Sequence, residues 1–165
     1  MLAGLHTLRA AEQEDTLTKV GQESPDFQWT ALDGSHHRLK DLRGKVVLIN
    51  FFATWCGPCM TEMPRLESEV WRKFQGTNFV MVAIGREHKA EELAEFKKKR
   101  QFTIPIAPDP KREIYGLFAT QYIPRNYVIG PDGKIAFQSK GYTEKEFSQM
   151  IEIIQRELAR AEKQS

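Results

Sequence analysis

Residues 46–59 read VVLINFFATWCGPC, an apolar run followed by two cysteines three positions apart. The run is hydrophobic at both odd and even positions, which is typical of a central strand buried on both faces of a sheet. Cys56 and Cys59 come where that strand gives way to a helix, and they are the only 2 cysteines of the chain. Two thiols at this spacing in the first turn of a helix can close a disulfide and reopen to a dithiol. The stretch therefore predicts a thiol–disulfide exchange site at a strand-to-helix junction.

A parallel strand–helix–strand unit is predicted around this site. Residues 78–84 form a second apolar run that resembles the first. Between the two runs, hydrophobic residues recur at intervals of three or four, as on one buried face of a helix: Cys59, Met63, Leu66, Val70 and Phe74. Strands joined through such a helix pair in parallel, with a right-handed crossover.

The remaining elements extend this unit to a mixed sheet. Two short strands, 27–30 and 37–39, are predicted about a turn at Asp33-Gly34. Further on, the patterns predict a helix over 90–100, an edge strand over 103–107 that is limited by prolines, and a short helix over 111–119. Strands 127–129 and 134–138 are predicted to form a hairpin, and the last helix begins with a capping box of Thr143 and Glu146. The predicted fold class is α/β, a three-layer α/β/α sandwich with a central mixed β-sheet and an N-terminal β-hairpin extension.

Length and composition fit one globular domain. The chain has 165 residues, of which 41% are hydrophobic and 28% charged, and this leaves little room for a second core. Residues 1–18 are rich in Ala, Glu and Gln and are predicted to form a flexible or helical lead-in. The domain is therefore expected over residues 19–165.

The charge pattern argues against nucleic acid as a partner. The 24 Lys and Arg residues against 22 Asp and Glu give a formal charge of +2, which is small and mixed in sign. The one basic run, 97–100, lies beside glutamates in a helical pattern and is expected to be a solvated helix face. No stretch approaches the ~18 apolar residues of a membrane span, and residues 1–20 carry no signal-peptide pattern.

The two cysteines are expected to have different roles. The unpaired N–H groups and partial positive charge of a helix N-terminus favour a thiolate at Cys56, which makes it the nucleophile. Lowering the pKa of a thiol from about 8.5 to about 7 takes roughly 2 kcal/mol, near the upper end of what a helix dipole supplies, so hydrogen bonds to the sulfur must help. Cys59 lies one turn further along the apolar stripe and is expected to be shielded and to resolve the mixed disulfide. Gly57 adds no side chain beside the sulfur, and Pro58 stiffens the ring without needing a donor.

Residues 52–59, FATWCGPC, resemble the active-site segment of thioredoxin-like proteins. Pro64 matches the proline that kinks the active-site helix in that superfamily, and Ile123-Pro124 matches its cis-proline loop. The resemblance implies that Pro124 is cis and presents a backbone edge for a substrate strand. It also implies substrate-binding positions at Trp55, Gly57, Pro58, Ile123 and Pro124. Trp55 is expected either to shield the site or to be an ordinary packed aromatic, and Arg125 and Asn126 either to touch a substrate or to be surface residues.

Three further segments resemble the TlpA-like and ResA-like branch, of AhpC/TSA-redoxin type. They are VGQESPDF at 20–27, the Asp33-Gly34 turn and LKDLRGK at 39–45. The branch comprises extracytoplasmic thiol-disulfide oxidoreductases, often reductants and sometimes serving cytochrome c maturation. The resemblance implies an enzyme that reduces protein disulfides through a Cys56/Cys59 cycle, in the bacterial periplasm or anchored to a membrane and facing it. The expected partners are a disulfide-containing client protein and a thiol electron donor, which could be membrane-bound. We expect a monomer with no cofactor besides the redox-active disulfide, no metal and no nucleic acid.

Two positions bear on proton transfer. Asn50 occupies the place where thioredoxin itself carries a buried aspartate, so that acid–base group is missing. Glu62, three residues after Cys59, matches a glutamate that ResA-like proteins place beside their dithiol. Its carboxylate is expected to take the proton that makes Cys59 nucleophilic, and the alternative is an ordinary exposed helical glutamate.

Other functions remain open on the sequence. Peroxiredoxins share the thioredoxin-like core, so a thiol peroxidase is the nearer alternative, but their threonine or serine and their proline are replaced here by Ala53 and Ile49. A non-catalytic binding module of the same fold would be free to lose either cysteine, and this chain keeps both. Structural zinc needs four ligands, and His36 and His37 lie beside an exposed turn rather than at ligand spacing from the cysteines.

Overall fold

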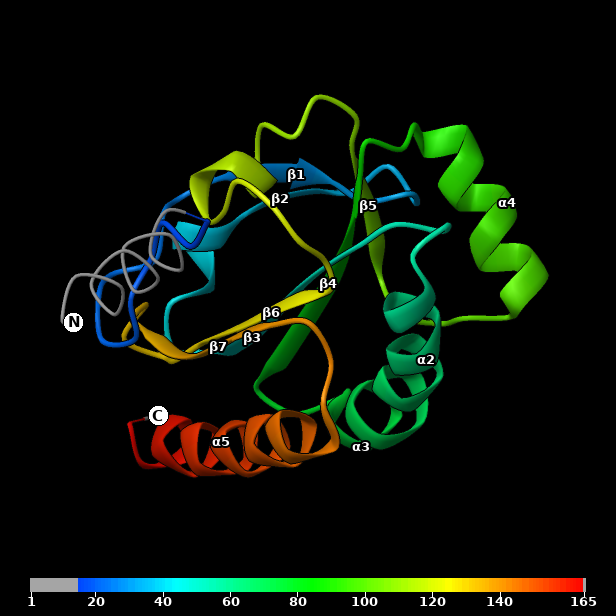
Figure 1. Ribbon diagram of the computed structural model, residues 1–165. Helices are drawn as coiled ribbons and strands as arrows, with labels where there is room; N and C mark the ends of the chain where they lie inside the picture. Colours follow the sequence, from blue (N-terminus) through cyan, green and yellow to red (C-terminus); the bar gives the residue numbers. More distant parts are fainter. Residues whose placement is uncertain (1–14, 165) are drawn as a thin grey trace, which may run out of the picture.

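A five-stranded mixed sheet forms the centre of the computed structural model, which describes residues 15–164 (Figure 1). Its strands lie in the order β5 (Ile106–Asp109), β4 (Phe79–Arg86), β3 (Val46–Phe52), β6 (Arg125–Ile129) and β7 (Ile135–Lys140). The pairs β3–β4 and β4–β5 are parallel, whereas β3–β6 and β6–β7 are antiparallel. The predicted parallel unit, the hairpin and the edge position of β5 are therefore confirmed.

Strand β3 is the middle strand, and every one of its residues is buried. Its apolar side chains point alternately to the two faces of the sheet and join the hydrophobic core on each side, as the hydrophobic run predicts. The one polar residue in β3 is Asn50, which lies opposite Ala83 of β4 and Asn126 of β6. This register brings two amide side chains into the interior at the same level of the sheet.

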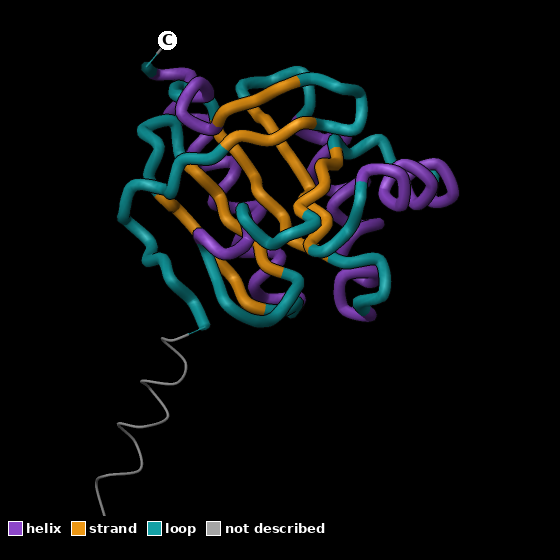
Figure 2. The backbone as a smooth tube through the Cα atoms, turned by 90° about the horizontal axis from the view of Figure 1, so that it is seen from above, coloured by secondary structure: helices purple, strands orange, loops and turns teal. Residues whose placement is uncertain are grey.

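Helices cover one face of the sheet. They are α2 (Gly57–Arg65), which continues through the wider π turn η2 (Leu66–Trp71) into α3 (Arg72–Phe74), then α4 (Ala90–Arg100) and α5 (Glu144–Lys163). All five residues of the predicted stripe on the first helix are buried. The π turn begins two residues after Pro64, which has no N–H to donate to the preceding turn. Figure 2 shows the strands side by side with the helices around them.

The other face is covered mainly by the hairpin of β1 (Gln28–Thr30) and β2 (His36–Arg38) and by the 3-10 turns η1 (Leu39–Leu42) and η3 (Tyr115–Leu117). This confirms the predicted N-terminal hairpin, which lies above the sheet in Figure 1. The helix predicted over 111–119 is wrong, because only η3 forms there. The Asp109 carboxylate accepts the backbone N–H groups of Ile114 (3.2 Å) and Tyr115 (2.8 Å), which replaces helical bonding by a capped loop.

The start of β5 also differs from the prediction. The strand begins at Ile106 rather than at Thr103. The buried carboxylate of Glu67, in the π turn, accepts the backbone N–H groups of Thr103 (2.9 Å) and Ile104 (3.0 Å). These two donors are therefore bonded to a helix side chain and not to a neighbouring strand.

The first described residues lie against this core. Leu17 donates its backbone N–H to the Phe118 carbonyl at 2.9 Å, and Thr16 forms an isolated bridge with Ala119. Asp15 and Thr18 are buried. Residues 1–14 of the predicted lead-in lie outside the described part. Within residues 15–164, none of the helices is both long and apolar enough to cross a bilayer.

Candidate active site

Cys56 and Cys59 form a disulfide at the junction between β3 and α2, with their Cα atoms 5.2 Å apart. Cys56 is the N-cap of α2, and its sulfur accepts the backbone N–H of Cys59 at 3.2 Å. This contact supplies one of the hydrogen bonds that stabilise a thiolate beyond the helix dipole. The two sulfurs differ in access, because Cys56 is 5% exposed and Cys59 is 0% exposed.

The surface beside Cys56 is formed by its sequence neighbours. Gly57 and Pro58 are exposed at the start of α2. Trp55 is 66% exposed, so it is not the packed aromatic that was one of the two expectations. Its ring lies 6.0 Å from the guanidinium carbon of Arg86. An exposed indole next to the more accessible sulfur offers a large apolar contact area to an incoming protein.

The loop before β6 lies against the disulfide from the other side. The Ile123–Pro124 peptide bond is cis, as the resemblance implies. The carbonyl oxygen of Ile123 lies 3.8 Å from the sulfur of Cys56, although the two residues are 67 positions apart in sequence. Pro124 is buried and Ile123 partly buried. The structure thus brings the predicted cysteine and proline segments together.

Glu62 is buried inside α2, with 1% of its surface exposed, so it is not an ordinary surface glutamate. Its two carboxylate oxygens accept hydrogen bonds from Asn50 Nδ2 (2.9 Å) and Asn126 Nδ2 (2.9 Å). Asn50 Nδ2 also donates to Asn126 Oδ1 at 2.8 Å. The three side chains come from α2, β3 and β6 and form one buried polar cluster that links the cysteine helix to the sheet.

Burial raises the pKa of Glu62 to about 7, because the low-dielectric interior disfavours the carboxylate. The hydrogen bonds from Asn126 and Asn50 act in the opposite direction, and the nearby charge of Glu146 adds to the rise. A carboxyl group with a pKa near neutral pH is suited to accept and release a proton.

Sequence reasoning missed the positions of three residues. Arg125 and Asn126 are 1% and 2% exposed, so they are neither substrate contacts nor surface residues. The register of β6 against β3 accounts for the burial of Asn126, and this pairing is a long-range feature that local pattern does not give.

His88, also buried, accepts the Thr54 backbone N–H at Nε2 (3.0 Å), and its Nδ1 lies 2.8 Å from Glu92. It therefore holds the residue before Trp55.

The described residues contain no cluster of three or more His, Cys, Asp or Glu side chains able to hold a metal ion. The ring nitrogens of His36 and His37 lie 3.0 Å from Thr30 Oγ1 and 2.8 Å from Ser35 Oγ, respectively. These are local contacts within the β1–β2 hairpin.

Comparison with protein families finds a match between residues 20–138 and the model of the AhpC/TSA family. The thiol-disulfide oxidoreductase ResA of Bacillus cereus is 33% identical over 128 residues, which cover 78% of this chain and 73% of that protein. ResA of Geobacillus thermodenitrificans is 31% identical over 142 residues, covering 86% of this chain and 81% of that protein.

Solved structures of thiol-disulfide exchange proteins are also similar to this chain. A candidate protein disulfide isomerase from Bacteroides thetaiotaomicron superposes with a TM-score of 0.84 at 34% identity, covering 88% of this chain and 93% of that chain. A candidate thiol:disulfide interchange protein DsbE from Chlorobium tepidum superposes with a TM-score of 0.72 at 26% identity, covering 85% and 98% respectively.

Proposed function

Because the chain belongs to the AhpC/TSA family and is, like its ResA relatives, a thioredoxin-like thiol-disulfide oxidoreductase, we propose that it reduces protein disulfides. The observation that carries the proposal is the Cys56–Cys59 pair at the start of α2, with the more accessible sulfur beside the Ile123 carbonyl. The Gly-Pro dipeptide between the cysteines is that of thioredoxin, whose potential is about −270 mV, and this favours reduction over oxidation.

In the first step, the thiolate of reduced Cys56 attacks one sulfur of a client disulfide. A bond forms between Cys56 and that sulfur, the client disulfide breaks, and the second client sulfur leaves as a thiolate that takes a proton from water. Trp55, Gly57 and Pro58 provide the surface for this encounter. The backbone of Ile123 and Pro124 provides an edge that an extended client segment can lie along with little sequence demand.

In the second step, Cys59 resolves the mixed disulfide. The Glu62 carboxylate accepts the proton of Cys59, whose thiolate then attacks Cys56. The Cys56–Cys59 bond forms, and the first client sulfur is released as a thiolate. Two electrons have passed to the client, and the enzyme is left in the disulfide form that the structure has. A thiol donor returns it to the dithiol by the reverse exchange, so no cofactor is needed besides this pair.

We place this cycle outside the cytoplasm, as the resemblance to the TlpA-like and ResA-like branch implies. A chain with 2 cysteines, both in the reactive pair, has no other thiol to mispair in an oxidising compartment. The client is a disulfide-containing protein, with apocytochrome c as one candidate, and the donor is a thiol protein that can be membrane-bound.

The proposal is tested by two measurements on the purified chain. Equilibration against glutathione and against a lower-potential dithiol buffer gives the potential of the Cys56/Cys59 couple. A value near −270 mV is expected, and one near −120 mV would identify an oxidant and overturn the direction. A peptide with a single disulfide should be reduced by the dithiol form, and failure to reduce it would contradict the proposed activity.

A further inference from the structure

The loop that carries Ile123 is held by its backbone carbonyl groups. Tyr122 has a positive φ of 72°, which L-residues with bulky side chains rarely adopt. Its carbonyl oxygen accepts the Tyr115 hydroxyl at 2.6 Å and Arg125 Nε at 3.2 Å. The carbonyl oxygen of Gln121 accepts Arg125 Nε at 3.0 Å and a terminal guanidinium nitrogen at 2.8 Å. Both carbonyls immediately before Ile123 are therefore fixed by donors from outside the loop.

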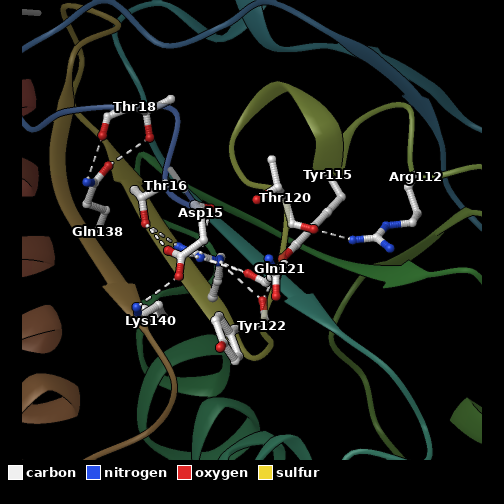
Figure 3. A network of polar contacts seen from close by, with 11 residues as sticks. Asp15, Thr16, Thr18, Arg112, Tyr115, Thr120, Gln121, Tyr122, Gln138 and Lys140 are labelled. Carbon is white, nitrogen blue, oxygen red and sulfur yellow. Dashed lines mark hydrogen bonds and ion pairs between the residues drawn. The ribbon is translucent and has the colours of Figure 1, made fainter. Parts of the chain in front are cut away.

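The guanidinium of Arg125 joins this loop to the first described residues. Its two terminal nitrogens donate to the Thr16 hydroxyl at 2.9 Å and to Asp15, at the backbone oxygen (3.0 Å) and at Oδ1 (3.1 Å). Figure 3 shows Asp15 and Thr16 on one side of this cluster and Gln121 and Tyr122 on the other. All three guanidinium nitrogens have partners, and the side chain is 1% exposed.

Asp15 balances the buried charge. Its second carboxylate oxygen accepts Lys140 Nζ at 3.1 Å, and that ammonium also lies 5.2 Å from the ring centre of Tyr122. Burial alone would raise the pKa of Asp15, but its hydrogen bonds with Lys140, Arg125 and Thr16 outweigh this and hold the pKa below its ordinary value. Asp15 is therefore ionised at neutral pH and paired with two cations.

We propose that Arg125 is a positioning residue for client binding: anchored by Asp15 and Thr16, it fixes the Gln121 and Tyr122 carbonyls so that the Ile123 carbonyl meets Cys56. The inference rests on the proposed reduction of protein disulfides. A buried ion pair is a costly way to fill space, since well-packed apolar groups of the same volume are often as stabilising. Its directional donors instead fix a backbone conformation, here that of the residue adjacent to the substrate edge.

The placement of Tyr122 follows from the same contacts. Its side chain is 57% exposed, whereas its backbone is held through its carbonyl. The direction in which this ring faces a client is therefore set by Arg125 and Tyr115. Loosening the ion pair should affect the contact with a peptide, and it should leave the chemistry of the two sulfurs intact.

The test compares Asp15→Asn, which keeps the shape of the side chain, with the wild type and with Asp26→Asn. Asp26 pairs with Arg38 at 2.8 Å on the surface, so its variant also removes a carboxylate charge from an ion pair, away from the loop. For a single-disulfide peptide, Asp15→Asn should raise KM about tenfold, since small misplacements of positioning groups can cost up to about 100-fold. The rate with 2-hydroxyethyl disulfide, which has no peptide backbone, should stay within twofold of the wild-type rate. The reduction potential should equal that of the wild type within experimental error.

Arg125→Lys gives the second variant, because Lys has the charge without the planar fork and should raise KM as Asp15→Asn does. If it fails to fold, Asp15→Asn with Thr16→Val is used instead. An unchanged KM in Asp15→Asn, or an equal rise in Asp26→Asn, overturns the proposal. Amide hydrogen exchange of residues 119–126 tests the positioning role of Arg125 even if the wild type reduces no peptide. We expect about tenfold faster exchange in Asp15→Asn and no change in Asp26→Asn. Unchanged exchange in Asp15→Asn overturns the proposal.

Discussion

Asn50 on β3 donates a side-chain N–H to the carboxylate of Glu62 on α2, and this buried hydrogen bond is 2.9 Å long. By the resemblance to thioredoxin-like proteins, Asn50 stands where thioredoxin itself carries a buried aspartate. In this chain the buried carboxyl group lies on the cysteine helix, as Glu62, three residues after Cys59. The Asn50 amide on the sheet is one of its two hydrogen-bond donors.

The first prediction concerns the rate at which Cys59 resolves a mixed disulfide. Glu62→Gln keeps the size of the side chain and removes the proton acceptor. We expect resolution to slow by about 10²- to 10⁴-fold near neutral pH, which is the usual contribution of a positioned general base. The pH dependence centred near 7 should also flatten, because that is where the carboxyl titrates.

The measurement is single-turnover release of a peptide from its mixed disulfide with Cys56, followed from pH 6 to 9. Glu91→Gln is the matched control, since it changes an exposed glutamate on α4. Equal rates and equal pH profiles for Glu62→Gln and the wild type would contradict the role of Glu62.

The second prediction concerns stability as a function of pH. The pKa of Glu62 is raised by burial from 4.5 to about 7 in the folded protein, so the folded state holds the proton more tightly than the unfolded one. The contribution to stability is therefore full below about pH 4.5 and is lost as the pH rises through about 7. The size of the shift corresponds to about 3 kcal/mol.

Urea unfolding of the oxidised protein between pH 4.5 and 8.5 measures this contribution. Glu62→Gln has no carboxyl at this position, so the difference in unfolding free energy between the variant and the wild type should grow in favour of the variant as the pH rises. A pH-independent difference would show that Glu62 titrates normally in the folded protein.

The third prediction separates the donors from the carboxyl group. Asn126→Ala removes an N–H that stabilises the carboxylate at 2.9 Å. The pKa of Glu62 should rise further, by about one unit or more, since hydrogen bonds to charged groups contribute about 1.5–3 kcal/mol. The midpoint of the pH profile for resolution should move upward by the same amount. Asn78→Ala, in the turn before β4, is the control, and coincident midpoints in all three proteins would contradict the assignment.

The sequence predicts the central part of the fold because the signal there is local. Apart from Asn50, residues 46–52 are apolar at both odd and even positions, and the stripe from Cys59 to Phe74 has helical spacing, so the order of strand, helix and strand follows directly. The prediction fails where a distant side chain captures the backbone. The Glu67 carboxylate takes the N–H groups of Thr103 and Ile104, and Asp109 takes those of Ile114 and Tyr115.

The same distinction holds at the site. The cysteines lie in one short sequence motif and Pro124 in another, and both could be predicted from these motifs, whereas Asn126 and Arg125 owe their importance to contacts far along the chain. Asn126 meets Asn50 through strand register, and Arg125 meets Asp15 across 110 positions. Local pattern at a strand start gives no sign of such partners, because an arginine there is usually exposed.

The last prediction assigns the two sulfurs. Cys59→Ser leaves Cys56 free to attack a client but removes the thiol that releases it, so the mixed disulfide should accumulate and be visible as a covalent adduct by mass spectrometry under non-reducing conditions. Cys56→Ser should form little adduct, because Cys59 is 0% exposed and lies one turn inside the helix. We expect at least a tenfold difference in adduct yield with a single-disulfide peptide, in line with the dependence of exchange on thiolate fraction and access. Both variants lack the intramolecular disulfide, which makes each the control for the other. Equal yields, or more adduct on Cys59, would reverse the assignment and with it the role given to Glu62, since a carboxylate that deprotonates the attacking thiol would then act in the first step and not the second.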